Sequence, residues 1–192
     1  MFKKSLLGTI LGFALINPSF ASEQTERTQV LKTINNYIGS VSCANSKIKS
    51  KDIFKIDSDL ETGITTYYVL WVGDKGCQGG SGTMSFYVSE VARYSSNRPF
   101  LVISDDAFGD NNEKAWSGED TTKTTINYRF IDSIKQISPE KFEIVAGAYA
   151  DEKFGGKDGG NNFPANTIKY TVQNGQDNGW KITNQVLLNQ NN

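Results

Sequence analysis

The sequence contains no histidine, and this absence excludes several classes of chemistry. Without an imidazole the chain cannot build a Ser-His-Asp or Cys-His nucleophilic system, a His-ligated zinc site or a histidine pH switch. With only two cysteines it also cannot build a Cys-rich zinc site. We therefore expect no metal site and no cofactor, and any catalysis would depend on carboxylates, lysine, tyrosine or a lone serine.

The chain also lacks an excess of positive charge, since 20 Lys and Arg stand against 21 Asp and Glu. Nucleic acids and anionic membranes are bound by clustered basic residues, and the one dense basic run here covers residues 47–51, Lys-Ile-Lys-Ser-Lys. We therefore expect no nucleic-acid partner. The basic run is interpreted as a solvated loop or strand edge, with an anion contact as the alternative.

Long apolar runs are absent except at the amino terminus. Two lysines precede a largely apolar stretch over residues 5–17, and small residues flank Phe20. This pattern is typical of a cleavable secretory signal, and the stretch is too short to span ~30 Å of hydrocarbon as a permanent helix. The sequence predicts a signal peptide at 1–21 and a single exported domain at 22–192, periplasmic or secreted, with no transmembrane segment in the mature chain.

The two cysteines, Cys43 and Cys77, are predicted to form a disulfide. An even pair in an exported protein is most simply a disulfide, because the compartment is oxidising. A reactive thiol at Cys77 is the alternative, but the sequence offers no base that would hold it as a thiolate. The predicted bond is structural.

The remaining pattern predicts an α+β fold. Apolar residues recur at helical spacing over 22–38, and Gly39 is a natural stop, so we expect an amphipathic amino-terminal helix. The rest of the chain has β-branched and aromatic segments separated by Gly, Asn and Asp clusters. The expected strands cover residues 53–56, 64–72, 83–94, 99–104, 124–131, 141–149, 167–173 and 180–187. We predict that the helix packs on one curved antiparallel sheet of about seven or eight strands.

Strand alternation over residues 64–72 divides the side chains between two faces of that sheet. One face should carry Tyr67, Val69 and Trp71, and the other should carry Tyr68, Leu70 and Val72. We expect burial in the core for these aromatic rings, with an exposed aromatic surface on one face as the alternative.

A glycine-rich turn at residues 74–82 is the densest local feature of the sequence. Glycine permits a positive φ and a close approach of ligand or backbone, so such a turn can present several N–H groups to a carboxylate or phosphate. The Gly-Lys-Ser/Thr ending of a phosphate-binding loop is absent. The alternative interpretation is a tight hairpin turn that the disulfide anchors.

Two connections, at 105–122 and 150–164, are longer than a hairpin requires, and such loops are often functional or mobile. Acidic and Asn clusters at 57–63, 110–113 and 151–162 lack the spacing of a calcium loop, and we interpret them as ordinary turns.

Paired carboxylates elsewhere in the chain are candidates for glycoside hydrolysis. The carboxylate pairs considered are Asp105 with Asp106, and Asp74 with Glu90. A glycosidase requires two carboxylates that face each other across ~5–10 Å, and the sequence alone does not show such a pair. We assign no catalytic residue and recognise no family from these motifs.

We expect a non-enzymatic exported binding protein, such as an inhibitor or an immunity-type protein that occludes another protein of the cell envelope. The alternatives are a hydrolase of cell-envelope polysaccharide that uses paired carboxylates, and a structural or assembly factor of the envelope. The candidate binding residues come from the 74–82 turn and the first long loop: Asp74, Lys75, Gly79, Gly80, Ser81, Asp110 and Trp116.

Overall fold

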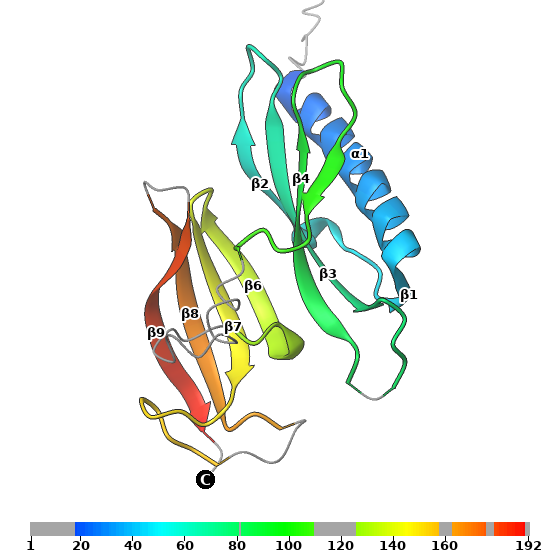
Figure 1. The fold of residues 1–192 in the computed structure, drawn as a ribbon. Coiled ribbons are helices and arrows are strands. Elements are labelled where there is room, and N and C mark those ends of the chain that lie inside the picture. The colour runs from blue at the N-terminus through cyan, green and yellow to red at the C-terminus, as the bar shows by residue number, and fades with distance from the viewer. Residues whose placement is uncertain (1–17, 81, 110–125, 158–162, 176–178, 191–192) are drawn as a thin grey trace, which may run out of the picture.

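The computed structural model describes residues 18–80, 82–109, 126–157, 163–175 and 179–190 (Figure 1). Three of the candidate binding residues, Ser81, Asp110 and Trp116, lie outside these ranges, as does most of the predicted signal peptide. Within these ranges the chain forms one α-helix and two antiparallel sheets. None of the helical segments that the structure describes is both long and apolar enough to cross a membrane.

The helix α1 spans Pro18–Val41. Pro18 suits the first turn of a helix, because the N–H that proline lacks would have no helical partner there. The prediction that the helix stops at Gly39 is wrong. The helix continues to Val41, whose carbonyl accepts the N–H of Gly76 at 2.8 Å. The end of the helix is therefore held by the glycine-rich turn rather than terminated by a glycine of its own.

The first sheet has five strands around a long central β3. Its strands are β1 (Ser42–Asn45), β2 (Ile53–Ser58), β3 (Thr65–Lys75), β4 (Ser85–Arg93) and β5 (Leu101–Ser104). Both β1 and β2 pair with the same side of β3, β1 near its end and β2 near its start. The segment between them, which includes the short 3-10 helix η1 (Ser50–Asp52), therefore crosses the edge of the sheet.

The second sheet is a four-stranded meander in the order β6-β7-β8-β9. Its strands are β6 (Ile131–Ser138), β7 (Lys141–Ala148), β8 (Asn166–Asn174) and β9 (Trp180–Gln190), and the 3-10 helix η2 (Tyr128–Phe130) precedes them. The prediction of a single sheet is wrong. The pairing of the first sheet ends at β5, and the chain starts a separate sheet at Ile131.

The strand predicted at 124–131 is also misplaced, since β6 begins at Ile131. Apolar residues in β6 recur every three positions, at Ile131, Ile134 and Ile137, which is not strand alternation. The pairing register of β6 with β7 shifts between Ile131 and Ser133. A bulge of this kind inserts an extra residue, so Ile131 and Ile134 both pack into the same core.

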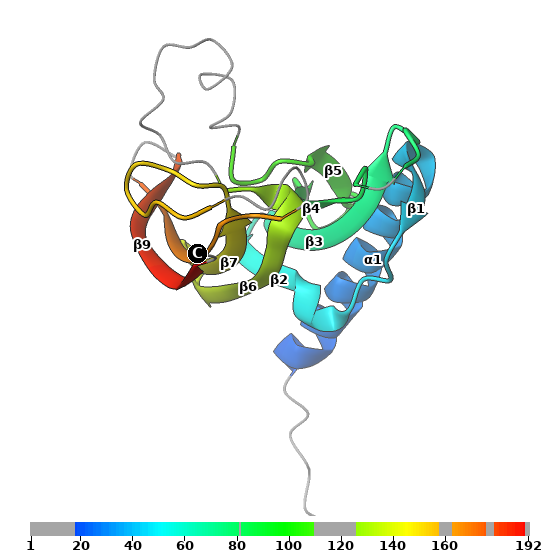
Figure 2. The ribbon, with the colours of Figure 1, turned by 90° about the horizontal axis from the view of Figure 1, so that it is seen from below.

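The molecule has three layers, with α1 and the second sheet on opposite sides of the first sheet (Figure 2). The predicted alternation of β3 is confirmed, because Tyr67, Val69 and Trp71 belong to the core under α1, whereas Tyr68 belongs to the core between the sheets. Val30, Ile34 and Ile38 supply the helix side of the first core. The aromatic rings of β3 are therefore buried on both faces, as expected.

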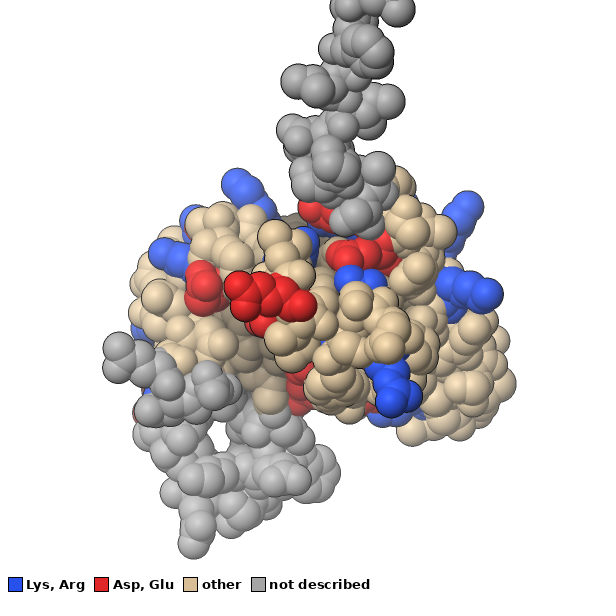
Figure 3. All heavy atoms as spheres, turned by 90° about the horizontal axis from the view of Figure 1, so that it is seen from above, with Lys and Arg blue, Asp and Glu red and all other residues tan. Residues whose placement is uncertain are grey.

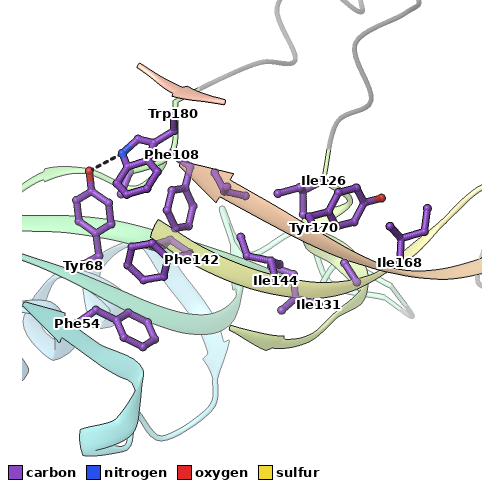
Figure 4. Packing of buried hydrophobic residues seen from close by; sticks show 14 of the residues in the cluster. Phe54, Tyr68, Phe108, Ile126, Ile131, Phe142, Ile144, Ile168, Tyr170 and Trp180 are labelled. Carbon is purple, nitrogen blue, oxygen red and sulfur yellow. Dashed lines mark hydrogen bonds between the residues drawn. The ribbon is translucent and has the colours of Figure 1, made fainter. Parts of the chain in front are cut away.

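Aromatic rings dominate the core between the two sheets (Figure 4). Phe142 on β7 lies at the centre of a cluster with Phe54, Tyr68, Phe108 and Trp180. The indole N–H of Trp180 donates to the hydroxyl of Tyr68 at 3.0 Å, which satisfies both polar atoms inside the core. This contact joins the last strand of the second sheet to the central strand of the first.

The predicted disulfide between Cys43 and Cys77 is confirmed, with the two Cα atoms 5.0 Å apart. It joins β1 to the turn that follows β3. The alternative of a reactive thiol at Cys77 is wrong, because that sulfur is bonded to Cys43.

Candidate functional site

The 74–82 turn is organised by the carboxylate of Asp74. Its side chain is buried, and its oxygens accept the backbone N–H of Gln78 at 3.2 Å and that of Gly79 at 2.9 Å. The backbone carbonyl of Asp74 accepts the N–H of Cys77 at 3.2 Å. Asp74 therefore positions the turn from inside and is not available to a ligand.

The backbone of this turn requires several left-handed conformations. Cys77 has φ of 57°, and Gly79 and Gly80 have φ of 66° and 122°. Only glycine adopts such values without strain, so Cys77 is held there by its disulfide and by the hydrogen bonds of the turn. No other heavy atom lies within 4 Å of a Cβ built on Gly79, so this part of the turn faces open space. The loop between β3 and β4 extends beyond the carboxyl end of α1 (Figure 1).

At the base of the turn, Lys75 forms an ion pair with Asp105, which follows β5. The hydroxyl of Tyr37 on α1 donates to the same carboxylate at 3.2 Å. Lys75 also lies 5.7 Å from the centroid of the Tyr87 ring on β4. These contacts bring together α1, the end of β3, β4 and the residue that follows β5.

The electrostatics of this group follow from its partial burial. Burial raises the pKa of Asp105, but the Lys75 ammonium and the Tyr37 hydroxyl more than offset this, so the pKa lies below its usual value. The hydrogen bond to Asp105 raises the pKa of Lys75. Burial and the Asp105 charge raise the pKa of Tyr37. At neutral pH the group is a charged Lys75–Asp105 pair against protonated tyrosines.

A cavity of about 200 Å³ lies beside this group. It is lined by Ser85, Phe86, Tyr87, Val88, Asp105, Asp106 and Tyr128. Its walls therefore combine aromatic rings from β4 and η2 with two aspartates. The far end of the turn closes on the same region, since a Cβ added at Gly82 would collide with the guanidinium of Arg129 on η2.

The predicted site residues are only partly brought together. Asp74, Lys75, Gly79 and Gly80 share the turn, whereas Ser81, Asp110 and Trp116 lie outside the described residues. The sequence placed Asp105 in the long loop at 105–122 and in a candidate carboxylate pair, and it did not assign Tyr37, Tyr87 or Tyr128 to binding. Tyr87 lay inside the predicted strand 83–94, and Tyr37 was predicted only as part of a helix face.

Asp74 and Glu90 do not have the separation of a hydrolytic carboxylate pair. In the β3-β4 ladder Gly73 pairs with Ser85 and Tyr68 pairs with Glu90. At ~3.3 Å per residue, Asp74 and Glu90 are on the order of 15–20 Å apart, beyond the ~5–10 Å that glycosidases use. Asp105 is held as an anion by Lys75, whereas a general acid needs a raised pKa.

The acidic cluster at 57–63 forms an ordinary turn between β2 and β3. Asp59 accepts the N–H of Glu61 at 2.8 Å and the hydroxyl of Thr62 at 2.7 Å, and these bonds lower the pKa of Asp59. Figure 3 views the end of the molecule that carries this turn and shows acidic side chains near the middle of that face. Within the described ranges, no three potential Cys, Asp or Glu ligands lie close enough to hold a metal ion.

No family model, curated protein or solved structure matches this chain. Its function is therefore argued from the turn, the Lys75–Asp105 pair and the adjoining cavity.

Proposed function

We propose that this chain is an exported, non-enzymatic binding protein that engages a protein partner through the 74–82 turn and the cavity beside it. The amino-terminal signal pattern and the Cys43–Cys77 disulfide support export to an oxidising compartment. The observation that carries the proposal is the outward-facing turn, which the disulfide and the Asp74 carboxylate constrain at residues 77–79.

Rigidity matters because binding normally loses the conformational entropy of the loop that becomes ordered. Here the disulfide and the Asp74 carboxylate constrain residues 74–79 of the turn. This part of the turn would therefore lose less conformational entropy when it meets a partner.

The cavity gives a partner a recess beside the turn. Its walls combine aromatic side chains of β4 and η2 with Asp105, whose charge is already paired with Lys75. A side chain of the partner inserted there would contact these walls, and the turn would supply the surrounding contacts.

The polysaccharide hydrolase is the less favoured function, because Asp74 and Glu90 lie too far apart for this reaction and Asp105 has the lowered pKa of an ion-paired carboxylate. A structural or assembly factor of the envelope would also bind a protein. It differs from an inhibitor only in the consequence of binding.

Photo-crosslinking from the turn tests the proposal. We would place a photoreactive amino acid at Gln78, in the full-length precursor expressed in the cells that naturally export it. A matched control carries the same group at Asn184, an exposed position on β9. We expect a discrete protein adduct from position 78 that is absent from position 184.

Two results would contradict the proposal. One is the same adduct from both positions, which would indicate random encounter. The other is no protein adduct from position 78 together with retention of the protein on peptidoglycan, which would favour the carbohydrate alternative.

A further inference from the structure

A second cavity, of about 290 Å³, opens at the edge of the two sheets where β1 and β2 leave β3 uncovered. It lies between the crossing segment 46–52 and the start of β6. Its volume approaches the ~300 Å³ at which small-molecule sites begin. It does not belong to the candidate site, and Phe86 is the one residue that lines both cavities.

The floor of this cavity is apolar. Leu70 and Val72 of β3, Phe86 of β4 and Ile134 of β6 line it from the two facing sheets. Leu70, Phe86 and Ile134 are only partly buried against the core between the sheets. The cavity is therefore an opening into that core, and an apolar group inserted there would cover surface that water now reaches.

The rim of the cavity is basic. Lys47, Lys49 and Lys51 all line it, and all three are exposed, with no ion pair among the described residues. Asp52, on the same rim, accepts the N–H of Lys49 at 2.8 Å and keeps its negative charge. The three ammonium groups therefore face two carboxylates, those of Asp52 and of Asp132 on β6.

We infer that this cavity binds a small organic anion, with an apolar body between the sheets and an acidic head group at the lysine rim. Charge complementarity selects the head group, since the three lysines outnumber the two carboxylates of the lining and leave an excess of positive charge. The apolar floor selects against a bare inorganic ion. A carboxylate and a phosphate monoester share the required chemistry, and the inference is independent of the protein partner proposed above.

Calorimetric titration with octanoate, octyl phosphate and neutral 1-octanol tests this inference on the purified protein. We expect one or both of the two anions to bind with 1:1 stoichiometry and octanol to bind at least about tenfold more weakly, the factor that ~1.4 kcal/mol represents. Binding of octanoate alone would identify a carboxylate ligand, and binding of octyl phosphate alone a phosphate ligand.

Two variants locate the binding. The triple change Lys47→Gln, Lys49→Gln and Lys51→Gln should weaken anion binding by at least about tenfold. The matched control changes Lys32, Lys135 and Lys157, three exposed lysines elsewhere, to Gln and should leave it within about twofold. Ser133→Trp, which keeps the lysines but fills the cavity, should abolish binding.

The inference is overturned if neither anion binds at millimolar concentration, if octanol binds as tightly as the anion that binds better, or if the two triple variants lose affinity equally. The last result would show that only net charge matters. Circular dichroism of each variant distinguishes lost binding from lost structure. If Ser133→Trp fails to fold, the comparison of the two lysine triples decides alone.

Discussion

Removing the disulfide should destabilise the protein by about 4 kcal/mol. Cys43 and Cys77 are separated by 34 positions, and in the chain-entropy model a closed loop of that length removes ~13 cal/mol/K from the unfolded state, or about 4 kcal/mol at 25 °C. For a chain of this size each kcal/mol lowers Tm by ~2–4 °C, so the expected fall is about 8–16 °C. The perturbation is the double variant Cys43→Ala/Cys77→Ala.

Urea denaturation followed by tryptophan fluorescence measures the free energy of unfolding of this variant. Reduced wild-type protein is the matched control, since reduction opens the same loop without changing a side chain. The two should agree within about 1 kcal/mol. Because Gly76 donates to Val41 beside the bond, amide exchange at Gly76 should also accelerate in both samples.

The reasoning fails if thiol titration shows two free thiols in the reduced wild type while its urea midpoint is unchanged. The bond would then contribute little to stability, and the hydrogen bonds of Asp74 would hold the turn without it. Free thiols in native exported protein would contradict the disulfide itself.

Three further predictions concern single residues. Gly39→Ala should stabilise the protein by about 0.5–1 kcal/mol in thermal unfolding, because Gly39 lies inside α1 with open space around it; an unchanged or lower Tm would contradict this. Ser89→Ala should destabilise it by ~1–3 kcal/mol in urea, because Ser89 accepts the buried indole N–H of Trp71 at 2.8 Å; a loss near zero would mean that water replaces the hydroxyl. Asp105 has a lowered pKa, so its contribution to stability is present above its unfolded pKa of about 4 and is lost as pH falls through the folded value. The difference in urea midpoint between wild type and Asp105→Asn should therefore shrink below about pH 4, and a difference that is constant with pH would exclude an ionised Lys75–Asp105 pair.

The local features of this fold are predictable from the sequence because each depends on neighbouring residues. The alternation of side chains along a strand predicted which residues of β3 lie on each face of the sheet. The even number of cysteines in a chain with a secretory signal pattern predicted the disulfide. The division into two sheets is not local. It depends on which strand edges pair, and nothing in the sequence of β5 or β6 shows whether the two strands pair with each other. The bulge at Ile131–Ser133 also removed the alternation that would have located β6.

The candidate site was predictable only where it coincides with the turn. The glycines at residues 74–82 predicted the turn, because glycine adopts the positive φ values of such a turn without strain. Asp74 was assigned to binding, but its carboxylate bonds the backbone of its own turn, a role that sequence spacing does not distinguish from ligand contact. Tyr37 and Tyr128 lie far from the turn in sequence, and only the packing of α1 and η2 brings them near it.

The central claim is that the turn itself binds a partner, and a matched pair of glycine variants tests it most directly. Gly79 and Gly155 have φ of 66° and 65°, and no other heavy atom lies within 4 Å of a Cβ at either position. Alanine should therefore strain both backbones equally, while only Gly79 lies in the proposed interface. With the partner identified by crosslinking, its Kd should rise at least about tenfold for Gly79→Ala and stay within about twofold for Gly155→Ala. Equal affinity of the two variants for the partner would show that the turn only connects β3 to β4 and that the interface lies elsewhere.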